Sequence, residues 1–343
     1  MRRRRRWPGV PPIPVAEPVA EPGAEVVAEP ALEVAIVLAT LERADDLARL
    51  LRQVVAQAPA SSEIVVVDQS GPAQLARTAA QIEALADARV RHLPRAVRGL
   101  PGARNAGVAA TSAPILLFFD DDVVLWPGCV VSHLSRYRDP TVGGVVGRIR
   151  ERCLRSNARR TTNRLDRSGR IRTHLDGPDP VEIETLKGAN MSWRRRALAS
   201  VGGFDEAYAG TSLLEDADAS ERVRSVGWRL VYEPDAAVDH LHRATGGVRT
   251  EHADRTRWWR FHNTALFLRR HRGSLSLLPF AITFGAVAVR SAVEQRSAGA
   301  VAALLRAAVA GWRAGRGPVR SLAGIGNQDG RRTTSYIRPG IEP

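Results

Sequence analysis

The chain has 343 residues, of which 44% are hydrophobic and 25% charged, so it is long enough for one large folded domain with extensions. Its net charge of +14 and its pI near 11.2 predict attraction to anions, among them nucleotides, phospholipid headgroups, acidic glycans and nucleic acid, without selecting one. Two cysteines exclude a disulfide framework and a zinc site made of cysteine alone. We therefore expect a protein of the reducing cytoplasm.

Residues 1–32 differ in composition from the rest of the chain. The arginine run Arg2–Arg6 is followed by a Pro-rich stretch that repeats Val-Ala-Glu-Pro. No apolar segment follows the arginines, so this is not a secretory signal. We predict a disordered tail, whose arginines either form a solvated basic arm or touch an anionic membrane or RNA.

From Glu33 onward, short apolar segments alternate with helical ones. We predict strands over Val34–Ala39, Glu63–Val67, Val90–Leu93 and Pro114–Phe119, and helices over Ala44–Gln57, Pro72–Leu85 and Pro101–Ala110. Alternation at this spacing favours right-handed β-α-β units in a doubly wound parallel sheet of the α/β class. No Gly-x-Gly-x-x-Gly sequence follows the first strand, which argues against a dinucleotide-binding dehydrogenase.

The feature around which we organise the sequence is the apolar run Ile115–Phe119, which ends in Asp120, Asp121 and Asp122. Such a run predicts a strand buried on both faces of a sheet, and these sheets bind ligands at the carboxyl ends of their strands. Three adjacent carboxylates repel one another, and a bound Mg²⁺ or Mn²⁺ would offset that repulsion. The alternative is a solvated acidic turn that caps the next helix.

Eight short blocks resemble, in order and spacing, those of glycosyltransferase family 2 proteins with the GT-A fold. The blocks are Ala35–Arg43, Glu63–Ser70, Ala103–Gly107, Phe118–Asp122, Lys187–Ser192, Gly202–Glu206, Glu215–Asp218 with Arg222, and Val238–His240. The resemblance covers residues 33–265. One block alone is weak evidence, whereas eight in the family's order argue against a chance match.

The resemblance implies a Rossmann-like mixed sheet flanked by helices; outside the residues that it covers, the sequence pattern itself predicts a C-terminal helical extension. The resemblance further implies a nucleotide-binding half at 33–125 and an acceptor-binding, catalytic half at 126–265. The extension would occupy 266–316 and an irregular tail 317–343.

The resemblance also implies which residues bind a nucleotide sugar. Asp68 would bind the base and Asp121 the ribose, although an Asp at a strand end is also common in ordinary turns. Arg104 suits a diphosphate, or else forms a structural salt bridge to the acidic cluster. The complete predicted donor-binding set is Thr40, Glu42, Arg43, Asp68, Arg104, Asp121, Gly188, Ala189 and Asn190, in which Glu42 has the alternative role of beginning the next helix and the small residues allow close approach of the sugar.

Metal binding and catalysis are assigned in the same way. The resemblance implies that Asp120 and Asp122 hold Mg²⁺ or Mn²⁺, with His240, preferred to His242, as a third ligand. Asp216 is the predicted general base and Glu215 the residue that orients the acceptor or the sugar. Both acids begin a predicted helix that ends near Val226, where acids are also ordinary capping residues.

Between Val142 and Val181 the alternation of strands and helices is lost, and arginines crowd the sequence. These are Arg148, Arg150, Arg152, Arg155, Arg159, Arg160, Arg164, Arg167, Arg170 and Arg172. They favour either a solvated surface or a mobile loop that faces an anionic acceptor. Two short strands follow, Trp228–Tyr232 and Ala236–Val238.

The C-terminal region begins with an aromatic and basic helix at Arg255–Asn263. The apolar run Leu275–Val289 is interrupted by Pro279 and looks too short to span a bilayer, so we expect a packed or interfacial helix. An Ala-rich helix follows at Ala300–Arg316. This predicts a peripheral contact with the cytoplasmic face of a membrane.

We conclude from the sequence that the chain transfers a sugar from a UDP-, dTDP- or GDP-sugar to a hydroxyl of a glycan, lipid-linked or small-molecule acceptor. The family resemblance implies a divalent cation and inversion at the anomeric carbon. One alternative is a nucleotidyltransferase, although a phosphate-binding signature after the first strand is lacking. Another is a non-catalytic protein that binds nucleic acid or anionic surfaces, which leaves the placement of the acids unexplained; we expect no specific nucleic-acid partner.

Overall fold

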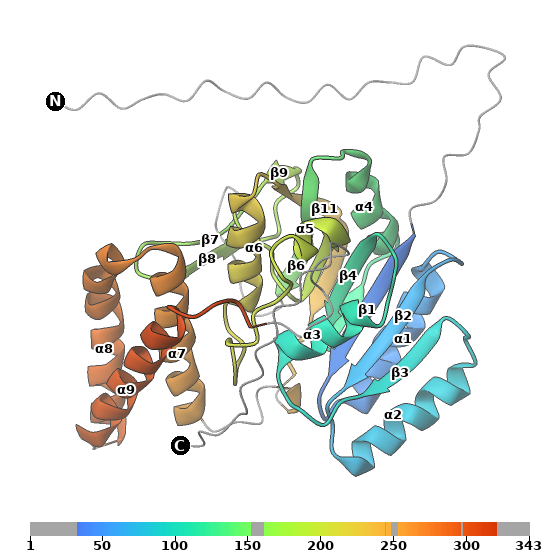
Figure 1. The fold of residues 1–343 in the computed structure, drawn as a ribbon. Helices are drawn as coiled ribbons and strands as arrows, with labels where there is room; N and C mark the ends of the chain where they lie inside the picture. Colours follow the sequence, from blue (N-terminus) through green and yellow to red (C-terminus); the bar gives the residue numbers. More distant parts are fainter. Residues whose placement is uncertain (1–32, 152–160, 244, 248–252, 296–297, 321–343) are drawn as a thin grey trace. The chain divides into compact units, whose positions relative to one another are not determined.

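A computed structural model describes residues 33–151, 161–243, 245–247, 253–295 and 298–320. The predictions for the tail at 1–32, for the arginines within 152–160 and for residues 321–343 lie outside these ranges. Within the described residues a nine-stranded mixed sheet carries helices on both faces, and three long helices follow it (Figure 1).

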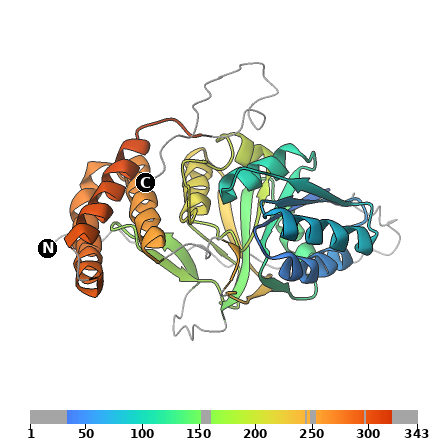
Figure 2. The same cartoon turned by 90° about the horizontal axis from the view of Figure 1, so that it is seen from below.

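The first half of the sheet is parallel, as the sequence predicted. Its strands β1 to β4 lie side by side in the order β3-β2-β1-β4. Along the chain, β1, β2 and β3 are each followed by a helix, α1, α2 and α3 respectively. The strands are Val34–Thr40, Glu63–Asp68, Val90–Pro94 and Ile115–Asp120, and the helices are Ala44–Gln57, Pro72–Leu85 and Leu100–Ala109. The apolar runs of β1, β2 and β4 are almost completely buried, because helices cover both faces (Figures 1 and 2).

The second half makes the sheet mixed, as the GT-A resemblance predicted and the simple parallel pattern did not. The order continues β4-β10-β6-β11-β5, and β10 is antiparallel to both of its neighbours. Strand β5 is antiparallel to β11, and β9 pairs with β11 off this path. The bounds are β5 Val123–Leu125, β6 Val142–Glu151, β9 Val181–Glu182, β10 Asn190–Arg194 and β11 Arg229–His240.

Strand β6 lies inside the sheet, and no helix is described between it and β9, so the alternation of strands and helices is lost after Val142 as the sequence predicted, although the strand itself was not foreseen. Glycines weaken the sequence signal for this strand. The structure requires them: a Cβ on Gly144 would collide with Leu186, and one on Gly147 with the carbonyl oxygen of Ala236. The two strands predicted at 228–232 and 236–238 are one strand, β11, whose register with β6 shifts between Glu233 and Ala237.

The remaining described part of the arginine-rich segment also has regular structure. Strands β7 (Thr162–Leu165) and β8 (Ile171–His174) form a separate antiparallel hairpin. Its arginines lie on the surface, where Arg172 pairs with Asp166 at 3.2 Å. The other short elements are α4 Cys129–Ser135, η1 Arg136–Arg138, α5 Arg195–Ala199 and α6 Glu215–Ser225.

Strand register brings the ends of three strands to one edge of the sheet. Thr40 is the partner of Asp68, and Ala39 is the partner of Asp120. Beneath this edge, Phe118 packs edge to face on Phe204 with ring centroids 5.5 Å apart. The polar residues at the edge therefore project from a fully packed core.

The C-terminal extension contains α7 (Ala253–His271), η3 (Ser274–Ser276), α8 (Leu277–Gln295) and α9 (Ala298–Ala314). The predicted boundary at residue 265 falls within α7, which is continuous and belongs to two apolar clusters. Leu266 packs in a cluster with Leu214, the residue just before α6, and Phe261 packs in another with Phe284 of α8. Pro279 lies in the first turn of α8, where its missing N–H has no helical partner to lose, so it does not interrupt the helix.

A buried charge network joins α6 to α7. The carboxylate of Asp218 is completely buried and contacts Arg222 at 2.7 Å, His271 at 2.8 Å and Arg270 at 3.2 Å. Burial opposes ionisation of Asp218, but Arg222, His271 and Arg270 outweigh it and hold its pKa below the usual range. Arg270 also pairs with the buried Asp205.

We predict that Asp218→Ala lowers the free energy of unfolding by about 3–5 kcal/mol, because it leaves buried cations without their partner. Chemical denaturation at neutral pH measures this change. Since the native pKa of Asp218 is depressed, its contribution is present above the unfolded pKa and is lost as the pH falls below about 4. Asp254→Ala, at an exposed pair with Arg257, is the control and should change stability by less than about 1 kcal/mol.

Candidate active site

Two cavities open at the carboxyl edge of the sheet and share three residues. The first has a volume of about 510 Å³ and the second about 340 Å³. Leu100, Asp120 and His240 line both. A ligand in one cavity therefore lies next to a ligand in the other, with a carboxylate and an imidazole between them.

The acidic cluster has the composition of a cation site. Asp120, Asp122 and His240 each offer a ligand atom within 4.8 Å of the others. His240 Nε2 lies 3.1 Å from Asp122 Oδ1, and the buried Nδ1 of His240 has no hydrogen-bond partner. Two carboxylates and an imidazole suit Mn²⁺, and the oxygens suit Mg²⁺, so the predicted ligand set fits a divalent cation. His242 groups with His240 and Glu151 instead, stacking on His240 at 3.9 Å between ring centroids.

Arg43 neutralises the acids that face the first cavity. Its Nη1 lies 2.7 Å from Asp121 Oδ1 and 3.3 Å from Asp122 Oδ2. The same guanidinium donates to the carbonyl oxygens of Thr245 at 2.9 Å and Gly246 at 3.0 Å. Arg43 was predicted to touch the nucleotide; the structure also makes it the link between the acids and the chain that follows β11.

Asp121 is not one of the three residues that could hold a cation, and its carboxylate contacts other side chains. Its carboxylate accepts hydrogen bonds from Thr40 Oγ1 at 2.8 Å and from Arg43. Burial raises the pKa of Asp121 to about 6, although Arg43 and Thr40 oppose the shift. In Asp122, burial is outweighed by His240, the backbone N–H of Arg243 and Arg43, so its pKa lies below the usual range. Neighbouring carboxylates are thus in different electrostatic environments.

The second cavity contains the two predicted catalytic acids at the start of α6. Asp216 accepts hydrogen bonds from the backbone N–H groups of Gly188 at 2.9 Å and Ala217 at 2.7 Å. Burial raises the pKa of Asp216 against the effect of these bonds. A carboxylate with a raised pKa, held in place by backbone donors, is suited to accept a proton.

Arg104 links the two groups of acids. It pairs with Glu215, and its Nη2 lies 3.3 Å from Asp120 Oδ1 and 3.2 Å from the carbonyl oxygen of Gly188. With only 2% of its surface exposed, Arg104 has the structural salt-bridge role that the sequence left open beside diphosphate binding. Burial and the charge of Asp216 raise the pKa of Glu215 to about 8, because they outweigh Arg104.

Three predicted donor-binding residues lie outside both cavities. Glu42 Oε1 accepts from the backbone N–H of Gly71 at 2.6 Å, so it ties the end of β1 to the β2-α2 turn. The side chain of Asp68 is completely buried and accepts from the backbone N–H of Ser70 at 2.9 Å. The Asn190 amide is buried, donates to Ala236 O at 2.7 Å and bonds to His133 at 2.8 Å. These three side chains make structural contacts, whereas Thr40, Gly188 and Ala189 line the cavities; donor binding by all six stays a prediction.

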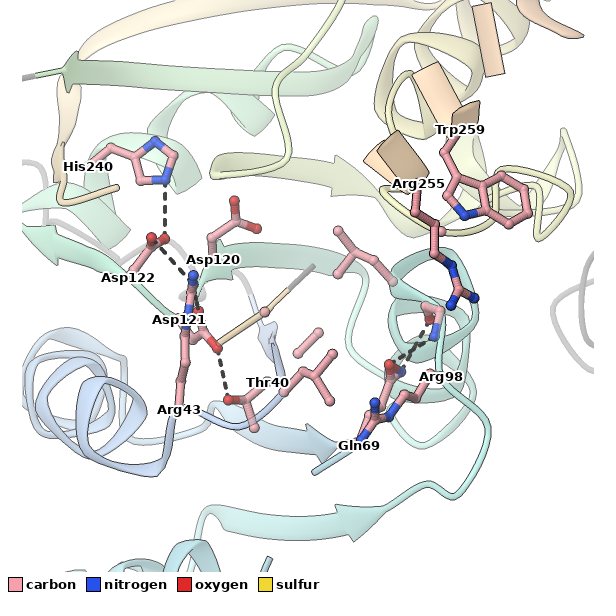
Figure 3. Close-up of a pocket in the computed structure, with 16 residues that line it drawn as sticks. Thr40, Arg43, Gln69, Arg98, Asp120, Asp121, Asp122, His240, Arg255 and Trp259 are labelled. Carbon is pink, nitrogen blue, oxygen red and sulfur yellow. Dashed lines mark hydrogen bonds and ion pairs between the residues drawn. The ribbon is translucent and has the colours of Figure 1, made fainter. Parts of the chain in front are cut away.

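Four side chains of the first cavity were missed. Figure 3 shows Gln69, Arg98, Arg255 and Trp259 across the cavity from the acids and His240. Gln69 follows Asp68, and its side-chain amide donates through Nε2 to the carbonyl oxygen of Gly99 and accepts through Oε1 from the backbone N–H of Gly99. Arg255 and Trp259 belong to the aromatic and basic stretch noted in the sequence, but nothing in its pattern places that helix beside the first strand.

We predict that Glu215→Gln flattens the pH dependence of stability. Because the native pKa of Glu215 is raised to about 8, the unfolded state ionises first and wild-type stability falls as the pH rises from about 4.5 to about 8. Each unit of difference between the folded and unfolded pKa of Glu215 changes the free energy of unfolding by about 1.4 kcal/mol at most. Denaturation at pH 5, 6.5 and 8 measures the slope. An unchanged slope in the variant would contradict the assignment, and Glu221→Gln is the matched control on the same helix.

Comparison with known protein families matches residues 30–260 to the family described as "Glycosyltransferase like family 2". Over 216 residues the chain is 31% identical to a pre-mycofactocin glycosyltransferase of Mycobacterium tuberculosis, which covers 61% of this chain and 42% of the relative. It is 36% identical over 115 residues to an N-acetylglucosaminyl-diphospho-decaprenol L-rhamnosyltransferase of the same organism, covering 29% of this chain and 35% of the relative. The matches thus span less than half the length of either relative.

Solved structures support the fold. GalNAc-T7 with UDP, GalNAc and Mn²⁺ has a TM-score of 0.59 at 16% identity, covering 71% of this chain and 48% of that one. The mannosyltransferase PcManGT from Pyrobaculum calidifontis, in complex with GDP-Man and Mn²⁺, has a TM-score of 0.50 at 18% identity, covering 82% and 81%. These likenesses establish the GT-A fold of the described domain.

Proposed function

This chain belongs to glycosyltransferase family 2, and we propose that it transfers a sugar from a nucleotide sugar to an acceptor hydroxyl. The observation that carries the proposal is the pair of adjoining cavities that share Asp120 and His240. One cavity takes the donor nucleotide and the other the acceptor. The anomeric carbon would then lie where the two meet.

The first cavity is suited to the nucleotide. Its acids and His240 lie on one side, while Arg98, Gln69 and Trp259 lie on the other (Figure 3). In this proposal Asp120, Asp122 and His240 hold Mg²⁺ or Mn²⁺, which when bound neutralises the charge of the departing nucleoside diphosphate. Thr40 and Arg43 fix the position of Asp121, which is thereby available to the ribose.

The second cavity is suited to the acceptor. Asp216 takes the proton from the acceptor hydroxyl as that oxygen attacks the anomeric carbon, and Glu215 with Arg104 maintains the position of the helix start. A raised pKa makes Asp216 a stronger base at neutral pH than an exposed carboxylate. A single direct displacement inverts the anomeric configuration, so we propose inversion.

Substrates are proposed by class. UDP-, dTDP- and GDP-sugars remain the candidate donors, and glycans, lipid-linked intermediates and small molecules the candidate acceptors. The names of the two relatives, one acting on pre-mycofactocin and one on a decaprenol-linked diphosphate sugar, support small-molecule and lipid-linked acceptors. Family membership argues against the nucleotidyltransferase and the non-catalytic anion-binding protein.

We predict that Asp216→Asn lowers kcat at least about 100-fold, because the acceptor hydroxyl loses its general base. Donor affinity should change little, since Asp216 lies outside the first cavity. Release of nucleoside diphosphate from a panel of nucleotide sugars, with Mn²⁺ and candidate acceptors, gives kcat and KM. A variant with full turnover would show that another group takes the proton.

We predict that Asp122→Asn weakens donor binding at least about tenfold in the presence of Mn²⁺, because one carboxylate ligand and part of the negative charge are lost. Titration calorimetry with the donor that wild-type protein accepts, with and without Mn²⁺, measures the effect. Asp176→Asn, at a half-exposed surface acid, is the control. If wild type binds its donor equally well without a cation, the proposed metal site is wrong. This result would not contradict the proposed glycosyl transfer.

A further inference from the structure

Helix α8 has two apolar faces, and only one of them is covered. Phe284, Ala288 and Ser291 are at most 4% exposed. Phe284 and Ala288 pack in one cluster with residues of α7 and α9, and the ring centroids of Phe284 and Phe261 of α7 lie 5.1 Å apart. A helix of a water-soluble domain normally needs only one such face. The second apolar face of α8 therefore requires an explanation.

The uncovered face is a continuous stripe. Leu278, Ile282, Val289 and Val293 are 60–71% exposed and succeed one another at intervals of four, seven and four residues, which places them on one side of an α-helix. Leu275, just before the helix, is 92% exposed. The intervals place this stripe opposite the buried face. Figures 1 and 2 show α8 farther from the sheet than α7.

The segment Ser274–Glu294 has 21 residues and is long and apolar enough to cross a membrane, which corrects the shorter length expected from the sequence. Only 22% of an apolar 18-residue window within this segment is buried, so the segment is not the core helix of a soluble domain. It is the one segment in the described part of the chain that meets these criteria. Large exposed apolar surfaces of this kind mark contact with a membrane or another protein.

The charge around the stripe selects between these partners. From Ser274 to Arg316 the sequence has five arginines and one acid, Glu294. On α9, opposite the buried Leu304 and Ala307, the exposed residues include Leu305 and Val309 together with Arg306 and Arg313. A second copy of this chain would bring like charges together, whereas an anionic phospholipid surface offers both hydrocarbon and negative headgroups.

We propose that the outer face of α8, with the exposed side of α9, lies in the plane of an anionic phospholipid membrane. The helix does not cross the bilayer in this arrangement. Its other face remains packed on α7 and α9, and α7 carries the exposed Arg255 and Arg260, which a spanning position would bring into hydrocarbon. This proposal concerns attachment and does not rest on the chemistry proposed above.

Co-sedimentation of the full-length protein with vesicles tests it. Wild type should bind vesicles of equal parts phosphatidylglycerol and phosphatidylcholine, bind pure phosphatidylcholine more weakly, and be released by alkaline carbonate. The outer-face variant Ile282→Ser, Val289→Ser and Val293→Ser should bind at least about tenfold more weakly, because it loses the apolar contribution. Serine keeps a helix propensity close to that of valine and isoleucine, so circular dichroism should show an intact fold.

The matched control changes exposed valines elsewhere: Val97→Ser, Val131→Ser and Val226→Ser, at positions 55–63% exposed, should bind like wild type. Arg306→Gln with Arg313→Gln should weaken binding to the anionic vesicles and leave binding to phosphatidylcholine unchanged. All variants keep Arg2–Arg6, so equal binding by wild type and the outer-face variant would assign attachment to that run and overturn the proposal.

Three further results would overturn it. One is absence of vesicle binding by wild type. Another is resistance to alkaline carbonate, which would make α8 a spanning helix. The third is that wild type sediments as a dimer that does not bind lipid, and that the outer-face substitutions dissociate this dimer. The partner of the uncovered face would then be a second copy of the chain. None of these outcomes depends on donor hydrolysis, so failure of the membrane proposal and failure of the proposed activity are distinguishable.

Discussion

Repulsion among carboxylates at one edge of the sheet is the constraint on which the site depends. Asp120 ends β4, Asp121 and Asp122 follow it in the turn to β5, and Glu215 and Asp216 begin α6 nearby. Arg43 lies against the first group, and Arg104 joins both groups. These two guanidiniums offset part of the negative charge, so the acids can be packed close together and still leave charge to attract a cation.

The same interactions connect the site to the rest of the molecule. Arg43 also donates to the backbone at Thr245 and Gly246, so the acids that follow β4 and the chain beyond β11 share one partner. In the first turn of α6, Asp218 forms ion pairs with Arg270 and His271 of α7. Helix α7 packs against α6 on one side and against α8 and α9 on the other, so the cavities and the surface proposed to meet the membrane are connected by packed helices.

Much of the site was predictable because its residues follow regular strands. Thr40 and Asp120 each end a parallel strand, and parallel strands bring their carboxyl ends to the same edge. Some residue types suit two roles: Asp68 and Asn190 have the polarity of ligand-binding residues, and in the structure their side chains bond to buried backbone and side-chain groups. Sequence cannot distinguish these roles, because the difference lies in which way the side chain points.

The sequence by itself determined the α/β class, the parallel first half, the acidic cluster and the family resemblance, since these depend on local periodicity and on residue order along the chain. Only the tertiary structure decided the position of β6, whose glycines conceal a strand that neighbouring side chains and a backbone carbonyl approach closely. It also brought Gln69 and Trp259 into one cavity and left one face of α8 uncovered. These features depend on contacts between residues far apart in sequence, which local patterns do not encode.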